Sequence, residues 1–245
     1  MRTRPDGAVA DQRRPHDSEI GIVQRDVAVS AHTFTVVSID LSHADLQLYW
    51  KQPGGSRFGT FDALANNLRA DGKQLLFAAN AGIFNPDFTP CGLHVEKGLE
   101  HVQLNLGNGD GNFYMKPNGI FLIDAAGAHI IDSTTYRGTT PDVRLATQSG
   151  PLLVINGMIN SAFKAHSTNR YIRSGVGVSS THRVRFAISL EPVTFFEFAS
   201  LFRDKLGCPN ALYLDGVISR FYLPPSETGT GGGEFAGILG ATAHE

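Results

Sequence analysis

The sequence lacks the short motifs that identify several common enzyme classes. Its 245 residues contain no GxxxxGK[ST] phosphate loop, no HExxH metal motif, no CxxC pair and no GxSxG nucleophile elbow. Two cysteines, Cys91 and Cys208, are too few to form a zinc site alone, and we expect both to be reduced thiols because they fall at opposite edges of the predicted sheet. The sequence therefore predicts no metal cluster and no cofactor, while a divalent ion held by one carboxylate and backbone carbonyls stays compatible with it.

The net charge is also small, and the sequence has no long apolar run. A formal net charge of −2 gives no reason to expect a nucleic-acid or membrane partner, and no run approaches the ~18 apolar residues of a transmembrane helix. Residues 1–20 are basic and polar without the apolar core of a signal peptide, so we expect a mobile tail there and a single domain over residues 21–245. This pattern predicts a cytoplasmic protein, or a periplasmic or secreted one if a leader was removed. It says nothing about oligomeric state.

Glycine and proline are plentiful, with 27 and 12 copies, which favours a turn-rich and strand-rich protein over a helical bundle. Hairpins are predicted for residues 118–132 and, around Asn156-Gly157, for residues 152–159. We predict an α+β fold in which mixed β-sheets are flanked by helices. Two ββαβ-like units, with a β-rich insertion between them, would build it.

The second of these units ends in the strongest catalytic candidate. Apolar residues at helical spacing from Phe195 to Leu206 predict a helix that stops at Gly207. Residues 211–214 are apolar throughout and predict a buried strand, which delivers Asp215 to its C-terminal end. The alternative is an Asp-Gly turn that simply closes the strand.

The first unit repeats this order and ends at Asn80. A predicted hairpin, residues 33–41 and 45–50, precedes a helical pattern that begins at Phe61, stops at Gly72 and leads to an apolar strand. The repeat makes Asn80 and Asp215 equivalent and predicts that they face one another across a shared cleft. The alternative is that helix–glycine–strand order is commonplace in α/β proteins.

Further polar residues beside strand ends and glycines supply amide, hydroxyl and cationic donors. The predicted binding residues are Asn80, Gly82, Lys116, Asn118, Gln148, Ser149, Gly150, Arg170, Gly216 and Ser219, with Arg173 as a catalytic cation. Such a set around one carboxylate suits an anionic, hydroxyl-rich substrate, whereas each arginine taken singly is more typical of a solvated surface charge. Glu191 is a second catalytic carboxylate in this prediction, because parallel strands would place it on the same sheet edge as Asp215. Its alternative role is helix entry.

Five segments in order, NAGIF, KPNGIF, ATQSGPLLV, RYIRSGVGV and NALYLDGVIS, resemble the phosphodiester glycosidase family, most closely its bacterial members of unassigned substrate. The resemblance spans about residues 33–241. It implies a hydrolase that cleaves the glycosidic bond of a sugar 1-phosphodiester, with a small-molecule or oligosaccharide phosphodiester as its partner.

A phosphate leaving group is already a stabilised anion, so one carboxylate and cationic donors could suffice for this reaction. We expect Asp215 to act at the anomeric carbon as nucleophile or base, and Arg173 with Arg170 or Lys116 to hold the phosphate. Asn80, Asn118 and Gln148 would bind sugar hydroxyls. Three alternatives stay open: a phosphodiesterase that attacks phosphorus, a non-catalytic carbohydrate- or nucleotide-binding module, and a serine hydrolase using Ser149, although no strained elbow surrounds that serine.

Overall fold

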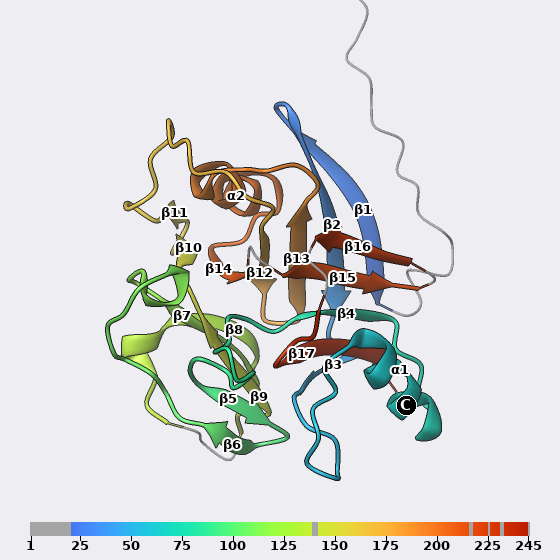
Figure 1. Ribbon diagram of the computed structural model, residues 1–245. Helices are drawn as coiled ribbons and strands as arrows, with labels where there is room; N and C mark the ends of the chain where they lie inside the picture. The colour runs from blue at the N-terminus through green and yellow to red at the C-terminus, as the bar shows by residue number, and fades with distance from the viewer. Residues whose placement is uncertain (1–20, 139–141, 216–217, 225, 231–232, 245) are drawn as a thin grey trace, which may run out of the picture.

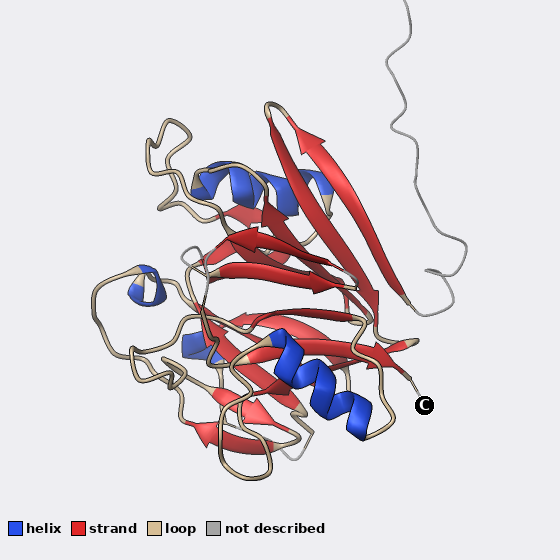
Figure 2. Cartoon of the chain, turned by 45° about the vertical axis from the view of Figure 1, so that its right-hand side comes forward, coloured by secondary structure: helices blue, strands red, loops and turns tan. Residues whose placement is uncertain are grey.

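The computed structural model describes residues 21–138, 142–215, 218–224, 226–230 and 233–244. The predicted mobile tail at residues 1–20 and the predicted binding residue Gly216 lie outside these ranges. In the part described, strands form the centre of the molecule and the α-helices lie on its outside (Figure 2).

The first sheet carries the second predicted unit. Its strands, in order across the sheet, are β1 (Ile22–Val29), β2 (His32–Asp40), β13 (Arg183–Ser189), β12 (Ser174–Ser180), β14 (Asn210–Asp215), β10 (Leu152–Ile155) and β11 (Met158–Ile159). All of these neighbours pair antiparallel. β13 and β14 consequently run in the same direction with β12 between them, as the sequence predicted.

Two further antiparallel sheets complete the architecture (Figure 1). The second sheet consists of β16 (Ser226–Thr230), β15 (Ser219–Leu223), β4 (Phe77–Asn80), β17 (Ile238–Ala243) and β3 (Ala44–Tyr49). The third sheet consists of β6 (Leu99–Val102), β5 (His94–Glu96), β9 (Leu145–Ser149), β7 (Gly119–Asp124) and β8 (Gly127–Asp132). The predicted hairpins β7–β8 and β10–β11 are confirmed.

One large core joins the three sheets. Phe186 of the first sheet, Phe77 and Phe221 of the second and Phe121 of the third are all fully buried in it. The ring centroids of Phe77 and Phe186 lie 4.9 Å apart, so the sheets contact each other through aromatic side chains. The sheets therefore share one core, and polar residues at strand ends of different sheets can meet.

The two helices each cover one sheet. α1 (Phe61–Ala70) buries Phe61, Leu64, Ala65 and Leu68 against the second sheet. α2 (Phe195–Ser200) continues as a π-helical turn over Leu201–Lys205 and packs on the first sheet. Short 3-10 turns span Asn112–Tyr114 and Ser133–Thr135. No described helix is long and apolar enough to span a membrane.

The structure corrects two predictions about the sheets. The described sheets are antiparallel rather than mixed. The predicted hairpin of residues 33–41 and 45–50 is wrong, because β2 pairs with β1 and β13 while β3 pairs with β17 of another sheet. Alternating apolar residues specify which face of a strand is buried but not which strand pairs with it, so the duplicated ββαβ unit is not confirmed.

Candidate active site

Asp215 ends β14, the strand that the apolar run predicted. Leu212 and Leu214 point into the central core, whereas Ala211 and Tyr213 face α2, so the strand is covered on both sides. Asp215 is itself buried, with 9% of its surface exposed. A carboxylate at the end of a fully covered strand is held in a fixed place.

Serine hydroxyls secure the backbone of Asp215. Ser219 Oγ donates to the carbonyl oxygen of Asp215 at 2.8 Å, and Ser174 Oγ lies 3.3 Å from the same oxygen. Ser174 is the partner of Asp215 across the β12–β14 ladder, and Ser219 Oγ lies 3.1 Å from Ser174 Oγ. The sequence prediction included Ser219 but missed Ser174, because only the strand pairing brings residue 174 beside residue 215.

Asn80 reaches the same place from the second sheet. Its side-chain oxygen lies 3.4 Å from Ser174 Oγ, so Asn80 and Asp215 contact the same serine. Asn80 is 1% exposed, and its Nδ2 is buried without a hydrogen-bond partner among the described residues. An unsatisfied buried donor costs about 1–3 kcal/mol, which is a reason to look for a ligand that accepts its hydrogen bond.

Ser149 and Gly82 form the next contact. Ser149 Oγ donates to the carbonyl oxygen of Leu214 at 3.2 Å. Gly82 has a φ of +129°, and a Cβ placed on it would lie 3.2 Å from Ser149 Cβ. Glycine is therefore required both by the backbone conformation and by the close approach to the serine. We call Asp215, Asn80, Ser149, Ser174 and Ser219 the Asp215 cluster.

Lys116 and Asn118 lie beside the Asp215 cluster, next to the residue that follows Ser149. A Cβ on Gly150 would come within 2.7 Å of Asn118 Cβ, so the residue after Ser149 packs directly on this asparagine. Asn118 Nδ2 donates to the Phe113 carbonyl at 3.0 Å, and its oxygen lies 3.4 Å from Lys116 Nζ. Lys116 is exposed. The peptide bonds before Pro117 and Pro151 are both cis.

Gln148 makes all of its hydrogen bonds inside the protein. Its oxygen accepts from the N–H groups of Leu93 and Asn105, and its nitrogen donates to the Asn105 carbonyl and contacts Ser133 Oγ. A Cβ on Gly92 would collide with this amide. Gln148 thus ties the segments around Leu93 and Asn105 to β9, a structural use that the sequence prediction did not include.

Arg173 is 1% exposed and contacts no carboxylate among the described residues. Its Nε donates to the Val193 carbonyl at 2.8 Å, its Nη2 donates to Asn169 Oδ1 at 2.9 Å, and its guanidinium lies 3.7 Å from the ring centroid of Phe195. Burial lowers the pKa of Arg173, which reflects the cost of holding a charge away from water. The partners that the structure describes for this cation are therefore uncharged groups and an aromatic ring.

Tyr213 connects Arg173 with Asp215. Burial raises the pKa of the Tyr213 hydroxyl, the positive charge of Arg173 lowers it, and the negative charge of Asp215 raises it further. The charges of Arg173 and Asp215 therefore both act on the buried hydroxyl of Tyr213.

The charge of Asp215 also acts on Cys91. Burial, and then the negative charge of Asp215, raise the pKa of its half-buried thiol. Sequence reasoning did not place Tyr213 or Cys91 at the site.

Arg170, three residues before Arg173, lies on the surface. Its Nη1 and Nη2 donate to the two carboxylate oxygens of Glu197 at 2.9 and 2.8 Å. Glu197 in turn belongs to the capping box of α2 with Thr194. The structure therefore buries Arg173, which directly precedes Ser174 of the Asp215 cluster, and gives Arg170 a partner on the helix.

Glu191 follows β13 and lies on the predicted edge of the first sheet, but far from Asp215. Its carboxylate accepts from the N–H of Thr33 at 2.8 Å, at the start of β2. From β14 to β2 there are three strand spacings, which amounts to about 14 Å. Paired carboxyl groups of glycosidases are about 5–10 Å apart, so Glu191 is too distant to work as the partner of Asp215.

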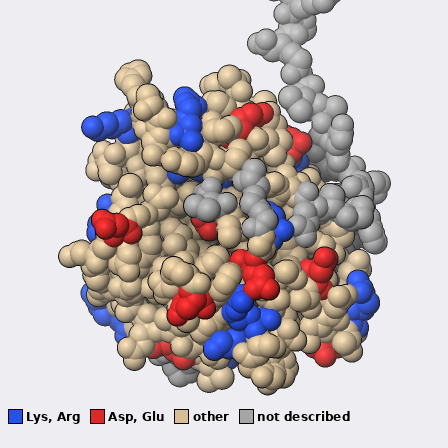
Figure 3. Space-filling view, in the orientation of Figure 1, with Lys and Arg blue, Asp and Glu red and all other residues tan. Residues whose placement is uncertain are grey.

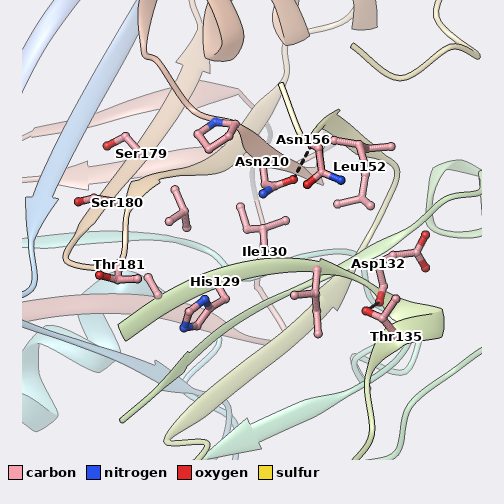
Figure 4. A pocket seen from close by; sticks show the side chains of 15 residues that line it. His129, Ile130, Asp132, Thr135, Leu152, Asn156, Ser179, Ser180, Thr181 and Asn210 are labelled. Atoms are coloured by element: carbon pink, nitrogen blue, oxygen red, sulfur yellow. Dashed lines mark hydrogen bonds between the residues drawn. The ribbon is translucent and has the colours of Figure 1, made fainter. Parts of the chain in front are cut away.

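The described residues contain no group of three His, Cys, Asp or Glu side chains placed to hold a metal ion. Both cysteines are free. A pocket of about 490 Å³ lies at the opposite end of β14, around Asn210, and does not include the Asp215 cluster (Figure 4). On the face shown in Figure 3, basic and acidic side chains are interspersed and form no area of a single sign.

Comparison with known sequences identifies a family. The profile of the family described as "Phosphodiester glycosidase" matches residues 73–225, a range that contains the whole Asp215 cluster. The chain is also 34% identical over 200 residues to the uncharacterized protein YigE of Escherichia coli K12, covering 81% of this chain and 78% of YigE.

Solved structures show the same fold. The catalytic domain of zebrafish N-acetylglucosamine-1-phosphodiester alpha-N-acetylglucosaminidase, auto-inhibited by its pro-peptide, superposes with a TM-score of 0.59 at 15% identity, covering 91% of this chain and 82% of that one. A hypothetical protein from Synechocystis gives a TM-score of 0.57 at 15% identity, covering 91% of this chain and 62% of its own length. At this identity the likeness concerns the fold alone.

Proposed function

This chain belongs to the phosphodiester glycosidase family, and we propose that it hydrolyses the glycosidic bond of a sugar 1-phosphodiester. One observation carries the proposal: the buried Asp215 and the buried Asn80 both contact Ser174, and the Nδ2 of Asn80 has no hydrogen-bond partner among the described residues. The buried Arg173 directly precedes this serine in the chain. These are the groups that a substrate combining a sugar and a phosphodiester requires.

The leaving group explains why one carboxylate is enough. Glycosidases ordinarily need a second carboxyl group to protonate the departing oxygen. A phosphate monoester departs as a stable anion and needs little protonation, so the remote position of Glu191 is no obstacle. We therefore assign Glu191 no catalytic step. Asp215 would attack the anomeric carbon itself or activate a water that does so.

Asn80 would bind the sugar. Its Nδ2 has two hydrogens to donate and no partner in the described chain, while its oxygen is already engaged with Ser174. A sugar hydroxyl that accepts from Nδ2 would satisfy this donor and set the distance between the sugar ring and Asp215. Asn118, next to Lys116, would extend this hydroxyl-binding surface.

Arg173 would hold the phosphate and stabilise the charge that develops on it as the glycosidic bond breaks. No carboxylate of the described residues pairs with this buried guanidinium, and a bound phosphate would offset its desolvation cost. Lys116 is the second cation of the proposal, because it is exposed and bonds only weakly to Asn118. Arg170 is not part of it, since Glu197 occupies both arms of its guanidinium.

The test is a panel of sugar 1-phosphodiesters, in which release of free sugar and of phosphate monoester is measured together. We expect equal amounts of both products from at least one substrate with the wild-type chain, and none with Asp215→Asn. The melting temperatures of the two proteins should agree closely, because the serine bonds to residue 215 use its backbone carbonyl. Full activity of Asp215→Asn would contradict the assignment, and saturable binding without product would indicate a binding module.

A further inference from the structure

The pocket at the opposite end of β14 has no role in the proposed reaction. It lies between β8 of the third sheet and the ends of β12, β10 and β14 in the first sheet, with a volume of about 490 Å³. Asn210 begins β14 and Asp215 ends it, a separation of about 17 Å along the strand. A ligand in this pocket could not touch Asp215, so the pocket needs its own explanation.

The pocket lining contains hydrogen-bonding residues and one acidic residue, Asp132. Ser179, Ser180 and Thr181 lie on one side of the pocket, and Asn156 and Asn210 lie on another (Figure 4). Ser179 Oγ contacts the Arg183 carbonyl, Thr181 Oγ1 contacts His182 Nδ1, and Asn210 Oδ1 accepts from the N–H of Asn156. The side chains of Ser180 and Asn156 are therefore the hydrogen-bonding groups that the pocket offers. No lysine or arginine is present among the lining residues. Hydroxyls and amides both donate and accept hydrogen bonds, which matches a ligand that carries many hydroxyl groups and no negative charge.

The edge position of β8 directs some of its backbone hydrogen-bonding groups towards the pocket. β8 is an edge strand of the third sheet, and the N–H of Ala128 points outward to the Thr181 carbonyl at 2.7 Å. Because alternate residues of an edge strand direct their backbone groups to the same side, the N–H and C=O of Ile130 point outward too, towards the pocket that Ile130 lines. His129, on the same strand, places its Nε2 3.3 Å from Asp124 Oδ1 and is therefore not counted among the groups open to a ligand.

Apolar side chains complete the lining. Ile130, Leu152 and Val178 present hydrocarbon surface beside the hydroxyls and amides. A sugar ring has the same mixture, with C–H groups on its faces and hydroxyls around its edge. Ligand pockets typically measure about 300–1,000 Å³, so this one has room for one or two sugar rings.

We propose that the pocket between β8 and the Ser179–Thr181 end of β12 is a second binding site, for a neutral mono- or disaccharide unit. The site is independent of the Asp215 cluster. It would let the protein hold a glycan at one place while the charged phosphodiester is bound at another. Asp132 lines the pocket and disfavours anions, so the phosphodiester itself does not belong there.

An extended peptide is the competing occupant, because it could add to the free edge of β8. The pocket does not favour it, since Ser179–Thr181 and Asn156 enclose the side opposite β8 where an added strand would need open space. The experiment therefore includes a peptide.

The test uses the full chain labelled with ¹⁵N and titrated with cellobiose, maltose and N,N′-diacetylchitobiose. We expect saturable shifts of the amide signals of Ile130, Ser180 and Asn210 with at least one of these sugars. Ser180→Trp places an indole at the pocket and should weaken binding by at least about tenfold. Ser42→Trp, on the exposed turn after β2, is the matched control and should bind as the wild type does. Asp215→Asn should also bind normally.

Four results would overturn the proposal. They are the absence of saturable shifts with all three sugars, equal binding by Ser180→Trp, equal binding of glucuronic acid, and shifts produced only by a neutral extended peptide such as acetyl-Thr-Val-Thr-Val-amide. Ser180→Ala checks that the position tolerates change, and it should retain the fold and most of the binding. None of these outcomes depends on turnover of a phosphodiester, so failure here would leave the proposed reaction standing.

Discussion

Two segments of the chain follow the same local plan and end at the same place. In the first, Thr60 caps α1, Gly72 adopts a φ of +77° after it, and β4 ends in Asn80. In the second, Thr194 caps α2, Gly207 adopts a φ of +61°, and β14 ends in Asp215. Asn80 and Asp215 then both contact Ser174.

The difference between the segments lies in their strand partners. β4 lies between β15 and β17 in the second sheet, whereas β14 lies between β12 and β10 in the first. The polar ends therefore approach from two sheets, and each brings a different group. β4 supplies an amide whose Nδ2 has no partner in the described part of the chain, and β14 supplies a carboxylate. The comparison suggests that Asn80 binds the sugar of the substrate, whereas Asp215 acts at its anomeric carbon.

The largest effect is expected from exchanging these two groups. Asp215→Asn should lower kcat by about 10⁴-fold, the scale of removing a reacting carboxylate. The double variant Asn80→Asp/Asp215→Asn restores the composition of the site but should not restore activity, because the carboxylate then approaches from the second sheet. Steady-state kinetics on one sugar 1-phosphodiester measures both. Recovery in the double variant would show that the two positions are interchangeable.

The next-largest effect is expected to distinguish the two arginines that precede the second segment, Arg173 and Arg170. Arg173→Lys keeps a charge but loses the fixed fork of donors, so kcat/KM should fall by about 10²-fold. The matched change Arg170→Lys should alter kcat/KM less than about twofold, since surface ion pairs contribute at most about 1 kcal/mol to stability. Phosphate product inhibition gives a second readout, and it should weaken only in Arg173→Lys. Equal losses in both variants would remove Arg173 from the phosphate site.

Asn80→Ala tests the binding half of the comparison. Loss of its donor should reduce kcat/KM by about 10- to 100-fold, less than the loss of Asp215, because the reacting group stays in place. Stability should change little or rise, since the variant removes an unsatisfied buried donor. A fall in melting temperature as large as the fall in activity would instead indicate a structural role.

The smallest effect is expected from removing the side chains that cap the two helices. Thr60→Ala and Thr194→Ala should each destabilise the fold by about 1 kcal/mol, with the larger loss at Thr194, whose backbone and hydroxyl groups both bond to Glu197. Burial raises the pKa of Glu197, but bonds from Thr194 and Arg170 outweigh it and hold that pKa below its ordinary 4.5.

A lowered carboxyl pKa stabilises the fold above the unfolded value, and this contribution is lost as the pH falls through the folded value. The free energy of unfolding of both variants is measured by denaturant unfolding at pH 7 and at pH 3. The additional destabilisation caused by Thr194→Ala, relative to Thr60→Ala, should be smaller at pH 3. If this additional destabilisation is the same at both pH values, the charge of Glu197 does not strengthen the cap at Thr194.

Much of this arrangement could be predicted from local sequence. The apolar run before Asp215, Gly207 after the helix and Asn156-Gly157 between two strands each act over a few residues, and each gave the correct element. Strand pairing could not be predicted, because it depends on contacts far apart in the chain. That is why the partner of β3 was missed and why Ser174 escaped notice.

Long-range contacts also decide the roles of residues of the same chemical type, so these roles could not be predicted either. Nothing in the sequence distinguishes Arg173 from Arg170, yet one is buried over Phe195 and the other is paired with Glu197. Gln148 is similar, since its partners Leu93 and Asn105 precede it by more than forty residues. Which donors face a substrate and which are used by the protein is decided by tertiary contacts.

Hydrolysis in ¹⁸O-labelled water tests the central claim most directly. If Asp215 acts at the anomeric carbon, as nucleophile or as base, the bond between that carbon and the phosphate oxygen breaks, and the label is expected on the released sugar. Mass spectrometry of both products decides the outcome. Label in the phosphate would show attack at phosphorus and would contradict the account.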